Sequence, residues 1–582
     1  GVIMKKGLAV SPGIGIGKAY IISEPDINID KDGIDTGQVK EELDRLSRAL
    51  ELSKNQLELI YKGAVSRGEK AKMEILEAHI MILEDPMLYG QAAEKVGNML
   101  VKAEYAYSMA VDEQLKVFEG IEDSYIRERA NDIRDVGGRM LKNLTGVPIK
   151  DISAINEEVI LLGKEITPSQ IAAGDPRYIK GIVSETGGIA SHTAILARNG
   201  GIPAVMGIPE ITAQVREGQL IAVDGSKGMV ELELDTEKLR QLQEKIMVNQ
   251  RLEQELRAIK DLPAMTRDGH RVRLECNIEG EAGAAKALKA GAEGIGLFRT
   301  EFLFMDRSSM PGEEEQYKAY RDAAVAMEGR PVIIRTLDIG GDKEVDYLKL
   351  PREANPFLGF RAIRLCLERE ELFKVQLRAI LRASAYGKIK LMYPMIAALE
   401  ELRKANSILK AAMDELEQEG VSFDRNLEVG IMIEIPAAAV IADVLAKESD
   451  FFSIGTNDLT QYTLAVDRTN EKVSYLYNSF EPSVIRLINT VIRSGHERGR
   501  PVGMCGEFAG NPSAAVLLLG LGLDEFSMSP AMLPKVKKVI NSVDMNYARE
   551  VAAAVLDMAT SRQIEEYLGE KLKELGLEHL QL

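Results

Sequence analysis

The sequence predicts a multidomain α/β protein that ends in a TIM (β/α)8 barrel. The chain has 582 residues, which is more than one hydrophobic core usually supports, so several domains are expected. Before Pro263, strand-like runs give way to long charged helices and then return. From Pro263 onward, apolar strand-like runs alternate with helical stretches. Together these patterns predict an interrupted α/β domain followed by the barrel.

The first part is predicted to be an α/β domain with a helical insert. Short strands surround a Gly-rich turn in AVSPGIGIGKAYII, and strand-like runs such as EVILLGKEI and QLIAVDG return later. Between them, stretches such as VKEELDRLSRALELSKNQLELIYKGA have the period of amphipathic helices. We therefore expect the α/β domain at 1–24 and 146–235, and the helical insert at 25–145.

A linker helix and the barrel complete the prediction. The charged stretch from Thr236 has Pro263 as its stop signal, which predicts a helix over 236–262. The barrel, over 263–582, is predicted from eight strand-like runs: VRLECNI, GIGLFRT, PVIIRTLDI, KIKLMYPMI, LEVGIMIEI, FFSIGT, RPVGMCG and EFSMS. Eight strands alternating with helices over roughly 300 residues are typical of a TIM barrel.

Composition restricts the location and the partners of the protein. The formal charge of −17 argues against nucleic acid, which needs a basic surface. An acidic surface suits a basic protein partner, although solubility explains it equally well. The longest uncharged run, 508–523, is too short for a membrane span, and the first residues lack the apolar core of a secretion signal. We expect a cytoplasmic protein without a membrane segment.

Polar side chains follow the predicted barrel strands at their C-terminal ends, where TIM-barrel enzymes carry their active sites. They are Arg299, Arg335, Glu434, Asn457, Asp458 and Cys505. Arg468 can join the two strand-end arginines, with Arg361 as a candidate fourth. Arginine makes bidentate contacts with phosphate and carboxylate, so this group indicates a small ligand with several negative charges.

The strand-end carboxylates and thiol suggest further chemistry. Glu434 and Asp458 follow adjacent strands and suit Mg²⁺, which binds through one or two carboxylates and substrate oxygens; Mn²⁺ accepts the same ligands. The alternative is that each carboxylate pairs with an arginine. Cys505 lies between glycines and can donate or accept a proton, or it is a small buried hydrophobe, as we expect for Cys276 and Cys366. Three scattered cysteines argue against a disulfide framework.

One of the five histidines lies in the stretch GGIASHTAILARNGGIPAV. His192 stands at the predicted start of a helix, whose free N–H groups favour an anion, behind the pair Gly187 and Gly188. No HxxxH pattern or cysteine cluster surrounds it, which argues against a metal ligand. Two interpretations are open: a partly buried core histidine, or a nucleophile whose neutral imidazole carries a phosphoryl group.

Two stretches carry a resemblance to a known family. GGIASHTAILAR resembles the phosphohistidine motif, and DFFSIGTNDLTQYTLAVDR resembles the second signature, of the phosphoenolpyruvate-utilising enzymes. The domain order and nearly the whole length resemble the Enzyme I family of the phosphoenolpyruvate-dependent sugar phosphotransferase system. One departure is Ala190, where relatives often carry Thr, which puts a hydroxyl contact near the histidine in doubt.

The resemblance implies a reaction. Phosphoenolpyruvate binds with Mg²⁺ in the barrel, His192 in a swivelling domain takes the phosphoryl group, and pyruvate leaves. The group then passes to a histidine of a small phosphocarrier protein docked on the helical insert. The family is usually a homodimer through the barrel.

The resemblance also implies roles for the strand-end residues. Arg299, Arg335 and Arg468 bind the substrate, with Asn457 assisting. Glu434 and Asp458 hold the metal, and Asp458 thereby also contacts the substrate. Cys505 protonates the enolate.

The partner contact and the family assignment each have an alternative. EAHIMILEDPML corresponds to the docking region, which makes Met81, Ile82 and Glu84 contact candidates, although an apolar stripe on a bundle helix is more often core. A pyruvate phosphate dikinase or phosphoenolpyruvate synthase shares the histidine and the barrel, but it carries a nucleotide-binding domain, and no Gly-rich nucleotide loop is evident here. A non-catalytic regulator that senses phosphoenolpyruvate is the third possibility.

Overall fold

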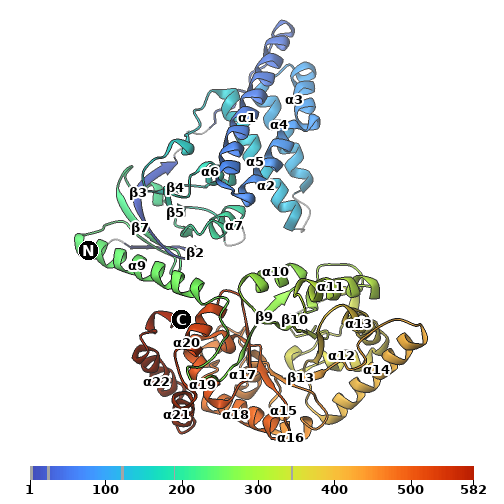
Figure 1. Ribbon diagram of the computed structural model, residues 1–582. Helices are drawn as coiled ribbons and strands as arrows, with labels where there is room; N and C mark the ends of the chain where they lie inside the picture. The colour runs from blue at the N-terminus through green and yellow to red at the C-terminus, as the bar shows by residue number, and fades with distance from the viewer. Residues whose placement is uncertain (1–3, 23–26, 119–123, 189–190, 342–344, 582) are drawn as a thin grey trace. The chain divides into compact units, whose positions relative to one another are not determined.

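The computed structural model describes residues 4–22, 27–118, 124–188, 191–341 and 345–581. The chain divides into two compact units, Gly1–Gln250 and Arg251–Leu582 (Figure 1). Among the described residues, no helix combines the length and the apolar character that a membrane span requires. The finer division of the first unit into a domain and an insert stays a prediction.

The strands of the first unit form one mixed sheet. Its eight strands run in the order β1-β8-β7-β3-β4-β5-β6-β2. All five residues of β4 are buried, and the first four alternate between two hydrophobic clusters, which shows that both faces of the sheet are covered. The strands are β1 (Met4–Lys6), β2 (Leu8–Ser11), β3 (Ile14–Ile22), β4 (Val159–Gly163), β5 (Ile179–Ser184), β6 (Ala204–Met206), β7 (Leu220–Asp224) and β8 (Met229–Glu231).

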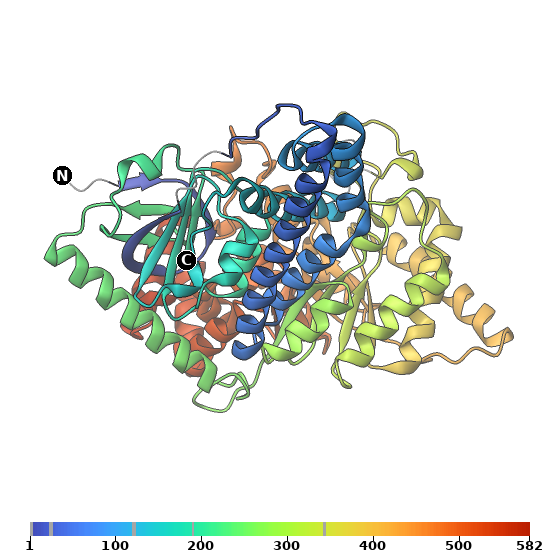
Figure 2. The ribbon, with the colours of Figure 1, turned by 90° about the horizontal axis from the view of Figure 1, so that it is seen from above.

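A helical bundle lies between β3 and β4 in the sequence, as predicted (Figures 1 and 2). Leu46, Leu57, Leu76, Tyr107 and Met140 form its core and are almost fully buried. The bundle helices are α1 (Val39–Arg67), α2 (Lys70–Glu84), α3 (Pro86–Met99), α4 (Ala103–Phe118) and α5 (Ser124–Thr145). Three short helices accompany the sheet: α6 (Pro168–Ala173), α7 (His192–Asn199) and α8 (Ile211–Gln214).

Polar contacts join the bundle to helix α6. The Asp135 carboxylate in α5 accepts hydrogen bonds from the backbone and the hydroxyl of Ser169, at 3.0 and 2.8 Å. At the other end of α6, the Nζ of Lys72 in α2 donates to the Gly174 carbonyl at 3.1 Å. Lys72 is buried, and burial lowers the pKa of its amine. The bundle therefore contacts both ends of the helix that packs against α7.

The predicted linker helix is α9 (Thr236–Ala258). It ends before the predicted limit of residue 262 because the chain turns there: the N–H of Lys260 bonds to Arg257 and that of Leu262 to Ile259.

The second unit is a closed barrel, which confirms the predicted fold. Its eight strands pair in parallel all the way round, and β16 closes onto β9. The strands are β9 (Arg273–Glu279), β10 (Ile295–Arg299), β11 (Val332–Arg335), β12 (Ile389–Tyr393), β13 (Val429–Ile433), β14 (Phe452–Ile454), β15 (Val502–Met504) and β16 (Glu525–Met528).

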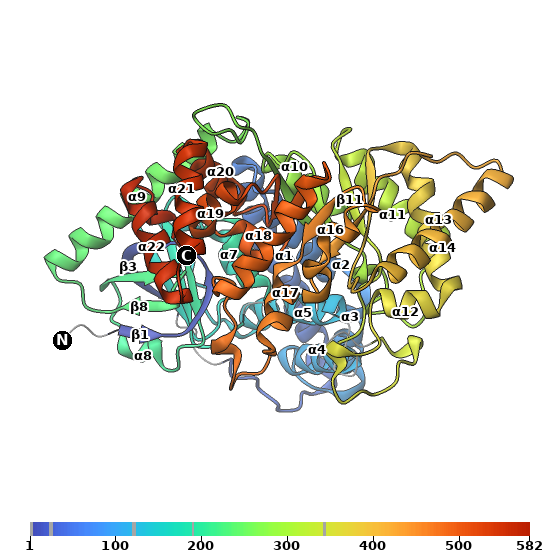
Figure 3. The same cartoon turned by 90° about the horizontal axis from the view of Figure 1, so that it is seen from below.

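Helices surround this barrel. The last four pack together through α19, as Figure 3 shows in red. The helices of the barrel unit are α10 (Glu281–Lys289), α11 (Glu313–Ala326), α12 (Ile363–Glu368), α13 (Glu370–Ala383), α14 (Leu399–Gln418), α15 (Pro436–Val440), α16 (Ala442–Leu445), α17 (Thr456–Leu464), α18 (Pro482–Glu497), α19 (Pro512–Leu521), α20 (Leu533–Asn541), α21 (Met545–Leu556) and α22 (Ser561–Glu574).

The glycine-rich N-terminal stretch permits close packing within the sheet, and this can be tested. A Cβ at Gly15 in β3 would lie 1.8 Å from the carbonyl oxygen of Lys180 in β5. We expect Gly15→Ala to lower the free energy of unfolding by about 1–3 kcal/mol through overpacking. Gly37→Ala is the matched control, because nothing lies within 4 Å of a Cβ there. Calorimetric unfolding with equal melting temperatures for both variants would contradict the packing argument.

Candidate functional site

A cavity of about 140 Å³ lies at the carboxyl ends of the barrel strands. Parallel strands of a barrel end at the same rim, so side chains that follow different strands converge there. The residues that sequence analysis selected in the barrel all line this cavity: Arg299, Arg335, Arg361, Glu434, Asn457, Asp458, Arg468 and Cys505. The structure therefore brings the predicted barrel residues together.

Buried arginines and carboxylates alternate along the cavity. Arg335 pairs with Glu301, and its Nη1 lies 3.1 Å from Oδ2 of Asp338. The other oxygen of Asp338 accepts a hydrogen bond from Nη2 of Arg361 at 2.9 Å. Next along, Nη2 of Arg361 lies 3.6 Å from Oδ2 of Asp458. The shared carboxylates hold both guanidinium groups in place before any ligand arrives.

The two predicted metal ligands differ in their surroundings. Asp458 accepts a hydrogen bond from Nη1 of Arg468 at 2.9 Å, so it does pair with arginines. Glu434 instead accepts a hydrogen bond from the backbone N–H of Met395 at 2.6 Å. Glu434 is only 2% exposed. Burial, followed by the negative charges of Asp458 and Asp338, raises the pKa of this carboxyl well above its usual range.

This donor set fits a divalent cation. A carboxyl whose ionisation is opposed by burial and by neighbouring carboxylates gains from an added positive charge. Within the described ranges, no group of three or more metal-capable side chains comes together. Mg²⁺ does not require one, because it binds through one or two carboxylates and completes its shell with water and substrate oxygens.

Cys505 follows β15, the seventh strand of the barrel, and faces the cavity from a buried position. Its backbone is held on two sides, since its N–H donates to the Ile454 carbonyl at 3.1 Å and its carbonyl accepts from Nδ2 of Asn277 at 2.7 Å. Burial raises the pKa of the Cys505 thiol, while Ser453 and Arg335 oppose the rise. The thiol is therefore protonated at neutral pH and available as a proton donor.

The other two cysteines match the expected buried hydrophobes. Cys276 and Cys366 belong to the main barrel core, and burial raises the pKa of the Cys276 thiol to about 12.

The less buried polar residues at the rim have partners of their own. Nη1 of Arg299 donates to Oε1 of Glu279 at 3.1 Å, and this pair is exposed. The Asn457 side chain accepts a hydrogen bond from the N–H of Glu507 at 3.2 Å. Because exposed ion pairs contribute little energy, Arg299 is free to exchange Glu279 for a charged ligand.

His192 begins helix α7 in the first unit, at the helix start that the sequence predicts. Ser191 caps this helix by accepting a hydrogen bond from the N–H of Ala194 at 3.2 Å. Gly187 has a φ of +115°, a backbone conformation that glycine adopts readily. The side chain of His192 and the whole of Ala190 lie outside the described residues, so the Ala190 departure stays untested.

The three docking candidates on α2 differ in how much of each side chain is exposed to solvent. Met81 is 65% exposed. Ile82 is partly buried and packs against the bundle core. Glu84 is half-exposed and pairs with Lys54. Met81 is the candidate that presents apolar surface to the outside.

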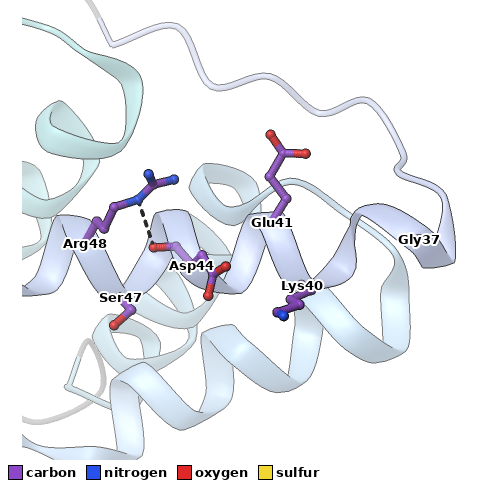
Figure 4. A pocket seen from close by; sticks show the side chains of 6 residues that line it. All are labelled: Gly37, Lys40, Glu41, Asp44, Ser47 and Arg48. Carbon is purple, nitrogen blue, oxygen red and sulfur yellow. Dashed lines mark hydrogen bonds between the residues drawn. The ribbon is translucent and has the colours of Figure 1, made fainter.

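A further hollow, of about 530 Å³, runs along the start of α1 (Figure 4). Its wall carries charges of both signs, and the side chain of Arg48 bonds to the backbone of Asp44 within the same helix. We assign no ligand to it.

The comparisons identify the family. A model described as the phosphoenolpyruvate-binding domain of the phosphoenolpyruvate-utilising enzymes matches residues 253–545. Models for their N-terminal and mobile domains match residues 6–129 and 155–228. A phosphoenolpyruvate-protein phosphotransferase of Priestia megaterium is 44% identical over 97% of this chain and 98% of its own length. One from Haemophilus influenzae is 45% identical over 99% and 100%. The chain belongs to the phosphoenolpyruvate-protein phosphotransferase family.

Membership in this family confirms the predicted resemblance and makes the chain an enzyme. It implies a requirement for a divalent metal ion in general. The match extends over nearly all of each relative named here, which favours this family over the dikinase or synthase that sequence analysis kept as an alternative. A solution NMR structure of an Enzyme I protein is 36% identical and covers 42% of this chain and 99% of its own, with a TM-score of 0.40.

Sequence analysis missed two carboxylates of the site. Glu301 lies two residues after Arg299, and Asp338 lies three residues after Arg335. Both stand in a similar context, Arg-Thr followed by an acidic residue, directly past the end of a barrel strand. That repeated pattern was a signal that could have revealed them.

Proposed function

We propose that this enzyme transfers the phosphoryl group of phosphoenolpyruvate, through His192, to a histidine of a small phosphocarrier protein and releases pyruvate. The observation that carries the proposal is the barrel cavity, where several arginines, three carboxylates and a protonated thiol meet. Phosphoenolpyruvate carries a phosphate, a carboxylate and a carbon that must gain a proton. Each of these has a matching group in the cavity.

Arg299, Arg335 and Arg468 bind the phosphate and the carboxylate of the substrate in this proposal, with Asn457 assisting. Arginine suits both groups because its planar fork makes two parallel hydrogen bonds. Arg335 is buried and already oriented by carboxylates, so little order is lost when the substrate binds.

Glu434 and Asp458 would hold the metal ion, which we propose to be Mg²⁺. When bound, the ion supplies positive charge that stabilises the phosphoryl oxygens. Asp458 also orients Arg468 through their hydrogen bond, so one carboxylate would serve both the metal and the substrate.

The group transfer balances with the residues named. A ring nitrogen of His192 forms a bond to phosphorus while the bond from phosphorus to the enol oxygen breaks, which leaves the enolate of pyruvate. The Cys505 thiol then gives its proton to the enolate carbon and regains one from water. The phosphoryl group leaves His192 when the histidine of the carrier attacks the same phosphorus.

One histidine serves two sites in this scheme, so we propose that the domain that carries it swings. Bonds near Gly146 and Asp235 are the proposed hinges. Gly146, with a φ of +73°, follows the last bundle helix, and Asp235 directly precedes α9. The resemblance to Enzyme I further leads us to propose a homodimer through the barrel and a cytoplasmic location.

His192→Ala should abolish phosphoryl transfer and leave phosphoenolpyruvate affinity within about twofold, because the substrate cavity lies in the other unit. The measurement is retention of label after incubation with phosphoenolpyruvate labelled in the phosphate, together with calorimetric binding. His270→Ala, at another histidine on the surface, should keep the label. Stable label on the His192 variant would reject this nucleophile.

Cys505→Ala should slow pyruvate formation by about 10²–10⁴-fold with little change in substrate affinity, since a proton donor acts mainly in the transition state. Rapid-quench measurement of pyruvate gives the rate. Cys276→Ala is the matched control, because that buried thiol belongs to the core and not to the cavity. If substrate affinity fell while the rate stayed unchanged, Cys505 would be a packing residue.

Met81→Asp should raise the KM for the phosphocarrier protein by about tenfold, as expected for a central apolar contact, and leave the KM for phosphoenolpyruvate unchanged. Met247→Asp on α9 is the control, because Met247 is also 65% exposed. Equal carrier kinetics for the two variants would remove Met81 from the docking surface and leave the barrel chemistry unaffected.

A further inference from the structure

Gln376 lies behind the two strand ends that carry Arg299 and Arg335. It belongs to α13, between β11 and β12 in the sequence, and is fully buried. Its Oε1 accepts a hydrogen bond from the N–H of Leu337 at 2.9 Å. Its Nε2 donates to Oγ1 of Thr300 at 3.2 Å. One side chain thus bonds to the segments that follow β10 and β11.

These contacts continue the pairing of the two strands beyond its last regular pair. Arg299 and Arg335 are register partners at the end of the β10–β11 ladder. The next residue, Thr300, donates its hydroxyl to the Arg335 carbonyl at 2.9 Å. Gln376 then bonds to that hydroxyl and to the N–H of Leu337. The backbone spacing of the two arginines therefore depends on a short, buried chain of hydrogen bonds.

The orientation of the Gln376 amide follows from its neighbours. A backbone N–H can only donate, so the atom that faces Leu337 must be the oxygen. On the other side, the Tyr320 hydroxyl donates to Oε1 of Gln316 at 3.0 Å and accepts from Nε2 of Gln376 at 3.2 Å. Tyr320 and Gln316 are also fully buried. The network consequently has one arrangement, and no other position of the amide satisfies it.

We propose that Gln376 is a positioning residue for phosphoenolpyruvate, whose amide fixes the spacing of the strand ends that carry Arg299 and Arg335. The inference rests on the proposed role of these arginines in substrate binding. Gln376 does not line the cavity in which the arginines meet the substrate. It acts through the backbone, because a displacement of either strand end would misalign the guanidinium groups that bind the substrate.

Replacement of the amide by an apolar chain of similar length is the direct test. Gln376→Met leaves the N–H of Leu337 without its acceptor and the Thr300 hydroxyl without its donor. The dissociation constant of phosphoenolpyruvate is measured calorimetrically in the His192→Ala background, so that no turnover occurs. We expect it to rise about tenfold, and the steady-state KM of the otherwise native enzyme to rise with it while kcat changes less.

Gln316→Met is the matched control. Gln316 is equally buried and belongs to the same network, but it bonds to Tyr320 and to the Pro311 carbonyl rather than to a strand end. Both methionine variants should lower the melting temperature, because each loses a buried amide. Only Gln376→Met should weaken substrate binding. Equal substrate affinity for the two variants would reduce Gln376 to a structural role.

A second pair of variants tests the positioning role if Gln376→Met does not fold. Thr300→Val removes the hydroxyl that bonds to the Arg335 carbonyl and keeps the shape of the side chain, whereas Thr300→Ser keeps the hydroxyl. We expect Thr300→Val to raise the dissociation constant about tenfold and Thr300→Ser to restore it to within about twofold. Wild-type affinity in Thr300→Val would overturn the inference.

Arg335→Met separates this inference from the proposed function. If Arg335→Met binds phosphoenolpyruvate as tightly as the wild type does, the arginine assignment fails, and the inference fails with it. If Arg335→Met loses affinity while Gln376→Met and Thr300→Val keep it, only the positioning role fails. Loss of affinity in all three variants, with Gln316→Met unaffected, supports both.

Discussion

The need to neutralise buried charge determines how the barrel cavity is built. Removing a guanidinium from water costs several kcal/mol unless a carboxylate and hydrogen bonds compensate. Arg335 and Arg361 are both buried, and Asp338 contacts both of them. Asp458 continues the same alternation toward Arg468. Each charge in this chain holds the next in place, so the cavity is oriented before a ligand enters, and a ligand rich in negative charge finds donors already aimed.

Much of this site could be predicted from the sequence, because a barrel imposes where strand ends meet. Once eight alternating strands were recognised, residues that follow different strands, such as Arg299 and Cys505, had to converge at one rim. The partners could not be assigned in the same way. Which carboxylate contacts which arginine depends on side-chain directions that periodicity does not contain. Glu301 reaches Arg335 across 34 positions of the sequence.

The positions of residues around each helix are a signal that would have identified further functional residues. In α13, Phe373, Gln376, Leu377 and Ile380 have the spacing of one helical face, and all four are buried. A glutamine at such a core position requires buried partners, and here they are Thr300, Leu337 and Tyr320. The same reasoning applies to α2, where Leu76, His79 and Leu83 form the buried stripe. Met81 falls outside that stripe, which explains its exposure.

The proposed nucleophile, His192, and the barrel cavity belong to different units of the chain. The described ion pairs that orient Arg335, Arg361 and Asp458 all join residues of the second unit. The segment around His192 contains small residues and has no comparable chain of ion pairs among its described contacts. Gly187, Gly188 and Ser191 are small, and the Ser191 hydroxyl satisfies the helix end locally. In the proposed reaction this histidine enters a second protein surface, and small neighbours suit that role because bulky ones would collide with each site that it visits.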